Sequence, residues 1–95
     1  MTTPGTESFR RVRQVVRRDL GSTAFLVNRQ RNTIHHLNAI GAAVWELLIH
    51  SVKRDELVRL LHLEFPSVKR GLIEKDVNAL LDRLLAAELI AKCGR

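Results

Sequence analysis

Residues 34–48 read IHHLNAIGAAVWELL, and the spacing of their apolar side chains changes at Asn38. Before Asn38 the pattern has the period of about two that is typical of a β-strand. After it, apolar residues recur at i, i+3, i+4, i+7 and i+8, the stripe of an amphipathic helix; they are Ile40, Ala43, Val44, Leu47 and Leu48. Since Asn38 is also a good N-cap, the sequence predicts that a strand ends here and that a helix to about His50 begins.

On the N-terminal side, three short runs rich in β-branched and aromatic residues predict an antiparallel meander. They cover residues 12–18, 23–28 and 32–37. The segments between them contain the Asp, Asn and Gly residues that tight reversals need. Residues 1–8 are small and polar without periodicity, and we expect them to be a disordered leader outside the fold.

On the C-terminal side, two further helices are predicted. One runs from about Arg54 to Phe65 and stops before Pro66, with Ser51 as the best side chain to cap it. The other covers residues 69–87 and carries a broad apolar stripe made of Ile73, Val77, Leu80, Leu81, Leu84 and Leu85. The closing segment 89–91 is short and apolar, and it fits either a last strand or a segment lying against the core.

Three strands followed by three helices, with a short break between the second and third helices, predict an α+β fold. The arrangement resembles a winged helix-turn-helix with its three-stranded antiparallel sheet at the front. At 95 residues the chain has room for one domain. We expect this domain to cover residues 9–92 and residues 93–95 to form a tail.

Composition favours a cytoplasmic binding protein. Cys93 is the only cysteine, so neither an intrachain disulfide nor a cysteine-based zinc site can form. The apolar stretches are far shorter than the ~20 residues that a membrane span requires, and the N-terminus lacks an apolar signal core. Because so small a domain buries a limited share of its surface, we expect shallow grooves rather than a deep active-site cavity.

The positive charge is concentrated in the first third of the chain. The formal net charge is +6; residues 1–37 carry seven arginines against two acidic residues, and the remainder is nearly neutral. The arginine-rich region, defined as Arg10, Arg11, Arg13, Arg17 and Arg18, could attract an acidic peptide or the acidic face of an enzyme partner. It could equally be a solvated edge that discourages self-pairing, and both interpretations stay open.

The residue patterns of enzymes and metal sites are missing from the sequence. There is no Gly-rich phosphate loop, no Cys-His pairing at a plausible spacing and no pair of carboxylates on a predicted cleft. His35 and His36 are adjacent in a strand, so they point to opposite faces and cannot bind one metal together. His50 and His62 have no suitable acidic or thiol partners nearby. We therefore expect no catalytic residue, no metal and no cofactor.

Four blocks of the chain together resemble the PqqD family. They are AFLVN (24–28), the segment 34–48, RDELV (54–58) with EFP (64–66), and IEKDV (73–77) continuing through Leu84 to Leu89 and Ile90. Each block is mostly apolar spacing, but their order and separations argue against coincidence. Glu88 departs from the pattern, since a small residue such as glycine is commoner before the closing Leu-Ile.

Members of this family are similar to pyrroloquinoline quinone biosynthesis protein D, the prototype of the leader-peptide recognition elements used in making ribosomally synthesised, modified peptides. The resemblance implies that the third strand is an open edge beside the third helix. A precursor's leader peptide would pair there as an added strand and be presented to a modifying enzyme, often a radical SAM protein. The expected peptide-binding residues are Asn32, Thr33, Ile34, His35, His36 and Leu37 on the strand, and Ile73, Asp76, Val77, Leu80 and Leu84 on the helix.

Several alternatives remain open. The helix stripe also fits ordinary core, and Asp76 fits either the lip of a groove or a plain surface carboxylate. A winged-helix DNA-binding regulator fits the total charge, but the third helix carries three carboxylates that phosphate would repel; its polar residues are Arg70, Glu74, Lys75, Asp76, Asn78, Asp82 and Arg83. A structural adaptor that binds a folded protein through an exposed Trp45 is a third interpretation.

Overall fold

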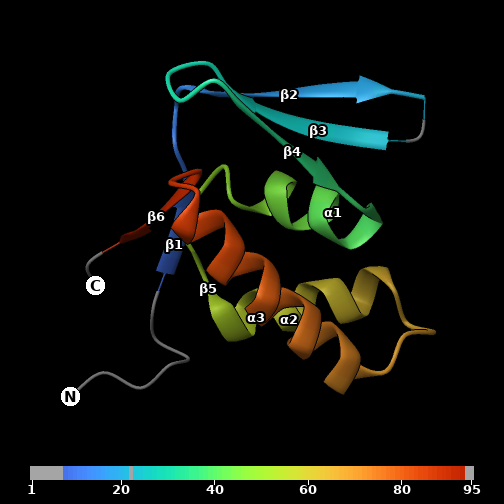
Figure 1. Cartoon of the computed structure of the whole chain (residues 1–95). Helices are drawn as coiled ribbons and strands as arrows, with labels where there is room; N and C mark the ends of the chain where they lie inside the picture. Colours follow the sequence, from blue (N-terminus) through green and yellow to red (C-terminus); the bar gives the residue numbers. More distant parts are fainter. Residues whose placement is uncertain (1–7, 22, 94–95) are drawn as a thin grey trace.

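The computed structural model describes residues 8–21 and 23–93, which form two small antiparallel sheets and three helices (Figure 1). One sheet has the strand order β2-β3-β4 and the other β5-β1-β6. The expected α+β fold is therefore confirmed, with a second sheet added. The elements are β1 (Ser8–Arg11), β2 (Val15–Leu20), β3 (Thr23–Asn28), β4 (Thr33–Leu37), α1 (Ala39–Leu47), β5 (Val52–Lys53), α2 (Arg54–Glu64), α3 (Arg70–Ala86) and β6 (Ile90–Cys93).

The predicted meander is present as β2, β3 and β4. Gly21, with a positive φ of 62°, lies in the short reversal that joins Leu20 to Thr23. In the longer reversal after β3, the Asn28 side chain accepts a hydrogen bond from the Arg31 amide at 3.2 Å. Asn32 has a φ of 56° and belongs to this turn. Its expected place in the strand is therefore wrong, because a residue in the left-handed conformation cannot continue the extended chain.

The first predicted strand is wrong in its extent. Residues 12–18 do not form one strand, because the chain leaves one sheet after Arg11 and enters the other at Val15. Phe9 on β1 is fully buried and Ser8 is 6% exposed, so Ser8 belongs to the fold and not to a leader. One buried aromatic residue in a four-residue strand gives too little periodicity to be recognised. Residues 1–7 of the expected leader lie outside the described residues.

The second sheet joins parts of the chain that are distant in sequence. β1 lies in the centre and pairs antiparallel with β5 on one side and β6 on the other. The closing apolar segment is therefore a strand from Ile90 onward, the first of the two possibilities, while Leu89 precedes it. Cys93 pairs with Ser8, so strand pairing includes one residue beyond each end of the expected 9–92 domain; residues 94–95 of the expected tail are not described.

The three helices begin close to the predicted positions. The Asn38 side chain accepts a hydrogen bond from the Gly41 amide at 2.8 Å, which confirms the predicted N-cap of α1. Ser51 does not cap α2, because β5 intervenes and places Lys53 at the N-cap position. Glu56 instead accepts a hydrogen bond from the Lys53 amide at 3.4 Å.

Glu88 forms the turn that ends α3. Its φ is 60°, and its amide donates to the Leu85 carbonyl at 3.0 Å while the Leu89 amide donates to the Leu84 carbonyl at 2.9 Å. These two bonds are those of a Schellman motif, in which glycine is the usual residue at the left-handed position. The chain therefore keeps this turn although it lacks the glycine.

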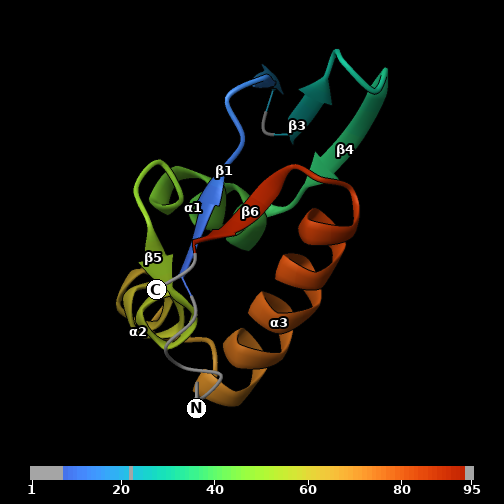
Figure 2. The same ribbon diagram turned by 90° about the vertical axis from the view of Figure 1, so that its left-hand side faces the viewer.

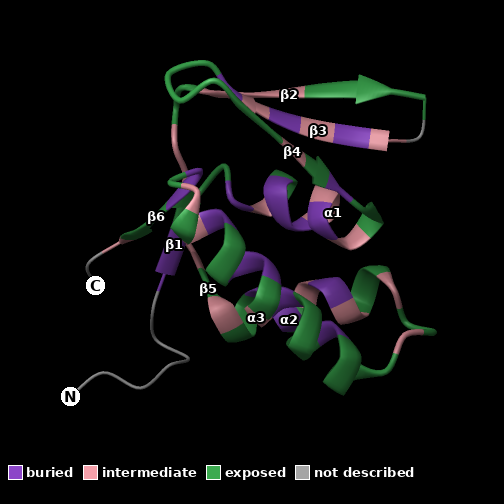
Figure 3. Cartoon of the chain, viewed as in Figure 1, coloured by how far each residue is buried: buried purple, intermediate pink, exposed green. Residues whose placement is uncertain are grey.

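The core lies where α1, α2 and α3 meet the two sheets, with buried positions on their facing sides (Figure 3). Trp45 is 1% exposed and the Arg11 guanidinium lies 5.1 Å from its ring centroid. An adaptor surface built on an exposed Trp45 is therefore wrong, since this side chain belongs to the core. In the described part of the chain, no helix is long and apolar enough to cross a membrane.

Candidate functional site

β4 is an edge strand. It pairs with β3 from Thr33 opposite Asn28 to Leu37 opposite Ala24. Across residues 8–21 and 23–93, no strand pairs with its other side. The open edge expected near residues 32–37 is therefore present, starting at Thr33.

The register decides which β4 amides face outward. Leu20 and Thr23 close a two-residue hairpin loop, so they form a hydrogen-bonded pair. Hydrogen-bonded and non-hydrogen-bonded pairs alternate along antiparallel strands. Ala24, Leu26 and Asn28 therefore direct their amides to β4. Their partners there are Leu37, His35 and Thr33. This leaves the N–H and C=O groups of Ile34 and His36 directed toward the open edge.

A side chain from α3 confirms this orientation. Arg83 Nη2 donates a hydrogen bond to the His36 carbonyl oxygen at 3.3 Å. The C-terminal half of α3 passes close to the end of β4 in Figure 2. The open edge is therefore flanked by a helix, as the family resemblance implies.

Between α3 and the start of α1 lies a shallow cavity of about 270 Å³. Its lining combines apolar and charged side chains, namely Asn38, Ile40, Gly41, Asp76, Ala79, Leu80 and Arg83. Asp76, Leu80 and Arg83 are spaced by four and three residues, so they follow one side of α3. Arg83 connects the cavity to the β4 edge, because it lines the cavity and also donates to the His36 carbonyl.

Most of the expected helix residues are core. Ile73, Val77 and Leu84 are 0% exposed, and Leu37 on the strand is 2% exposed. Their side chains face the interior, so the alternative that the stripe is ordinary core holds for them. Leu80 is 8% exposed and lines the cavity.

Asp76 is exposed and lies at the lip of this cavity. The structure therefore brings together the β4 backbone, Asp76 and Leu80 from the expected set. Sequence reasoning missed Arg83, Ala79 and the first turn of α1 as groove residues. The available signal was the spacing of Asp76, Leu80 and Arg83 along one side of the helix.

The two adjacent histidines lie on opposite faces of β4, as predicted. His36 packs edge-on against Phe25 with ring centroids 5.7 Å apart. His35 is half-buried, and its Nε2 atom has no hydrogen-bond partner among the described residues. The described residues contain no group of three or more His, Cys, Asp or Glu side chains that could hold a metal ion.

The arginine-rich region does not form one surface. Arg17 binds Asp19 at 3.0 Å and Glu46 on α1 at 2.6 Å. Its pKa is raised, chiefly by the side-chain hydrogen bond to Asp19. Arg10 and Arg13 instead line a separate hollow of about 360 Å³ beside β6.

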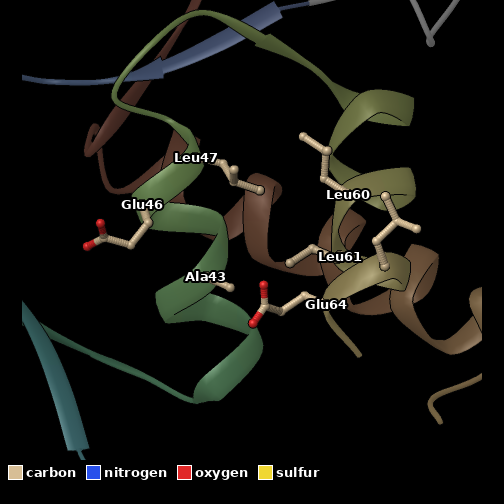
Figure 4. A pocket seen from close by; sticks show the side chains of 7 residues that line it. Ala43, Glu46, Leu47, Leu60, Leu61 and Glu64 are labelled. Atoms are coloured by element: carbon tan, nitrogen blue, oxygen red, sulfur yellow. The ribbon is translucent and has the colours of Figure 1, made fainter. Parts of the chain in front are cut away.

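A further hollow of about 490 Å³ lies between α1 and α2, away from the β4 edge. Figure 4 shows Leu47 and Leu60 on its two sides and Glu64 pointing across toward Ala43. Glu46 points away from it, in keeping with its bond to Arg17. Its apolar lining provides no hydrogen-bonding edge comparable to that of β4.

These features define a winged-helix-like α+β domain with an open sheet edge beside a helix. The family described as coenzyme PQQ synthesis protein D (PqqD) matches residues 23–90. The chain therefore belongs to the PqqD family.

Among solved structures, the chain is similar to "TbiB1 in Complex with the TbiA(beta) Leader Peptide", with a TM-score of 0.73 and 27% sequence identity. The match covers 90% of this chain and 99% of that chain. No curated protein matches the sequence.

Proposed function

We propose that this chain is a non-catalytic, cytosolic binding protein that captures the leader peptide of a ribosomally made precursor and presents it to a modifying enzyme. The leader pairs as an added strand along β4 and lies against α3. Membership of the PqqD family and similarity to a structure solved with a leader peptide support this proposal. A radical SAM protein is one candidate for the enzyme.

The observation that carries the proposal is the composition of the open edge. β2, the other outer strand of the same sheet, carries Arg17, Arg18 and Asp19, and β6 carries Lys92. Charges of this kind discourage pairing with other chains. β4 has neither a charged Asp, Glu, Lys or Arg residue nor a proline. Its edge is therefore suited to accept a strand.

The cavity beside the edge can supply side-chain specificity. Main-chain pairing alone gives affinity with little sequence preference, while pockets select alternate side chains of the guest. Leu80 and Ile40 offer apolar contact, and Asp76 and Arg83 offer opposite charges. We expect a guest with an apolar residue facing Leu80 and polar residues facing the two charges.

The primary experiment is a titration of isotope-labelled protein with candidate leader peptides. We expect the largest amide shifts in residues 33–37 and 76–83, because these line the edge and the cavity. Shifts confined to the arginine-rich region would contradict the placement of the site.

Two proline variants test strand addition directly. Ile34→Pro removes an N–H that faces outward, so it should leave the domain folded and weaken peptide binding about tenfold or more, as expected for a lost ladder bond and a misaligned edge. His35→Pro removes an N–H bonded to β3 and should destabilise the domain by about 3 kcal/mol. Equal peptide affinity for Ile34→Pro and the unmodified protein would rule out pairing at this edge.

DNA binding gains no specific support from the geometry. Glu74, Asp76 and Asp82 are all exposed on α3, where a recognition helix needs bases. A gel shift on mixed duplex DNA with a steep salt dependence would favour that alternative.

A further inference from the structure

The sheet β2-β3-β4 has an outer face that none of the described helices covers. The three helices lie on the opposite side of this sheet in Figures 1 and 2. On β3, Ala24, Leu26 and Asn28 are buried toward the core, so the alternate residues face outward. With their cross-strand partners, the outer-face residues are Val16, Arg18, Leu20, Thr23, Phe25, Val27, Ile34 and His36.

This outer face is more apolar than a solvated sheet face should be. Antiparallel sheets with one face in water normally alternate between apolar inward and polar outward residues. Here Val16, Val27 and Ile34 form one cross-strand row, and Phe25 stands between Arg18 and His36 in the next. Leu20 is 70% exposed and Ile34 is 69% exposed. Val16, Phe25 and Val27 between them are partly exposed, and apolar side chains gathered in this way on a protein surface mark interaction sites.

We propose that the outer face is a docking surface for a folded protein whose contact surface has an apolar centre and carboxylates at its rim. If the proposed function holds, this partner is the enzyme that modifies the captured peptide. The charge on the face defines the partner's chemistry: Arg18 carries it, and the one carboxylate of β2, Asp19, pairs across from Ala24 on the inner face.

The same charge argues against a second copy of this chain as the partner. Two outer faces placed together would bring two Arg18 side chains, and no carboxylate, into one apolar contact. Like charges facing each other across an apolar contact are unfavourable. An acidic surface would instead complement them.

The position of the face also links docking to peptide capture. A guest strand beside β4 would add its own alternate side chains to the two rows that end at Ile34 and at His36. The loaded protein would then offer a wider surface than the free protein. An enzyme that docks there would contact the domain and the guest together.

The probe for this surface is 8-anilinonaphthalene-1-sulfonate, which combines apolar rings with an anionic group. We expect it to shift the methyl signals of Val16, Val27 and Ile34 in the labelled protein. The uncharged analogue N-phenyl-1-naphthylamine separates the apolar contribution from the ionic one. Peptide titration reports instead on the β4 backbone, so each proposal can fail without the other.

Three variants test whether the dyes bind to the outer face of the sheet β2-β3-β4. Ile34→Thr keeps the outward N–H of β4 but removes apolar surface, and we expect about fivefold weaker binding of both dyes, in line with the loss of a small apolar contact. Arg18→Gln should weaken binding of the sulfonate about threefold and leave the neutral analogue unchanged. Leu63→Thr, at a residue 71% exposed beside the α1–α2 hollow, is the matched control and should change neither.

Three results would overturn the proposal. The first is dye binding centred on Leu63 and insensitive to Ile34→Thr. The second is a dimer in sedimentation equilibrium that Ile34→Thr dissociates, which would assign the face to a second copy. The third is co-sedimentation with phosphatidylglycerol vesicles that Ile34→Thr abolishes, which would assign it to a membrane.

Discussion

Arg83 on α3 donates a hydrogen bond to the backbone carbonyl of His36 on β4, with 3.3 Å between Nη2 and the oxygen. This carbonyl faces the edge that carries no charged Asp, Glu, Lys or Arg side chain of its own. The charge that a protected edge strand would carry is therefore supplied from a neighbouring helix. We infer that Arg83 covers this edge in the free protein and so discourages pairing between two copies of the chain. An incoming peptide strand would displace it.

Arg83→Met should expose the edge and increase self-association. The lost bond is near the surface, so the free energy of unfolding should fall by less than about 1 kcal/mol. Sedimentation velocity over a concentration series measures the association. Arg70→Met, at the other end of α3, is the control and should behave as the unmodified protein. If Arg83→Met stays monomeric at every concentration, Arg83 does not prevent self-association.

Asn38→Ala should destabilise the domain by about 1 kcal/mol, because the Gly41 amide loses the side chain that caps α1. Asn38→Asp should retain the cap and gain from a negative charge at a helix whose first turn has no acidic residue. Urea unfolding of the two variants measures both effects. Equal losses for the two would mean that the cap contributes nothing.

Glu88→Gly should be about 1 kcal/mol more stable than Glu88→Ala, since glycine adopts a positive φ without the steric cost that alanine pays. The comparison with alanine matters because both variants lose the ion pair between Glu88 and Arg31, whose oxygen and nitrogen are 2.6 Å apart. Thermal unfolding distinguishes them. Indistinguishable midpoints would argue that the turn relaxes to another conformation.

Trp45 should report its buried position through fluorescence. At 1% exposure, this single tryptophan should emit at short wavelength and resist acrylamide quenching. Arg11→Gln removes the cation over its ring and should cost about 1 kcal/mol. Arg13→Gln, at an exposed residue between β1 and β2, should change stability by less than about 0.5 kcal/mol. A strongly quenched Trp45 would contradict the core described above.

Local signals in the sequence were sufficient for the elements that run continuously along the chain. The change of period at Asn38 located both the end of β4 and the cap of α1, because the pattern and the capping chemistry act within a few residues. The apolar stripe of α3 was also clear. What the stripe could not show was which of its residues face the core and which face a groove.

Contacts between distant segments were decided by the tertiary structure. β1, β5 and β6 are two to four residues long, which is too short to show a periodicity in the sequence. The second sheet becomes recognisable only once these strands are paired. Full burial of Ile73, Val77 and Leu84, and the reach of Arg83 to the His36 carbonyl, depend on how α3 packs. The sequence by itself determined the local periodicities, the cap and the family. Packing determined the edge and its neighbours, because hydrogen-bond partners far apart in the chain are selected only when the core closes.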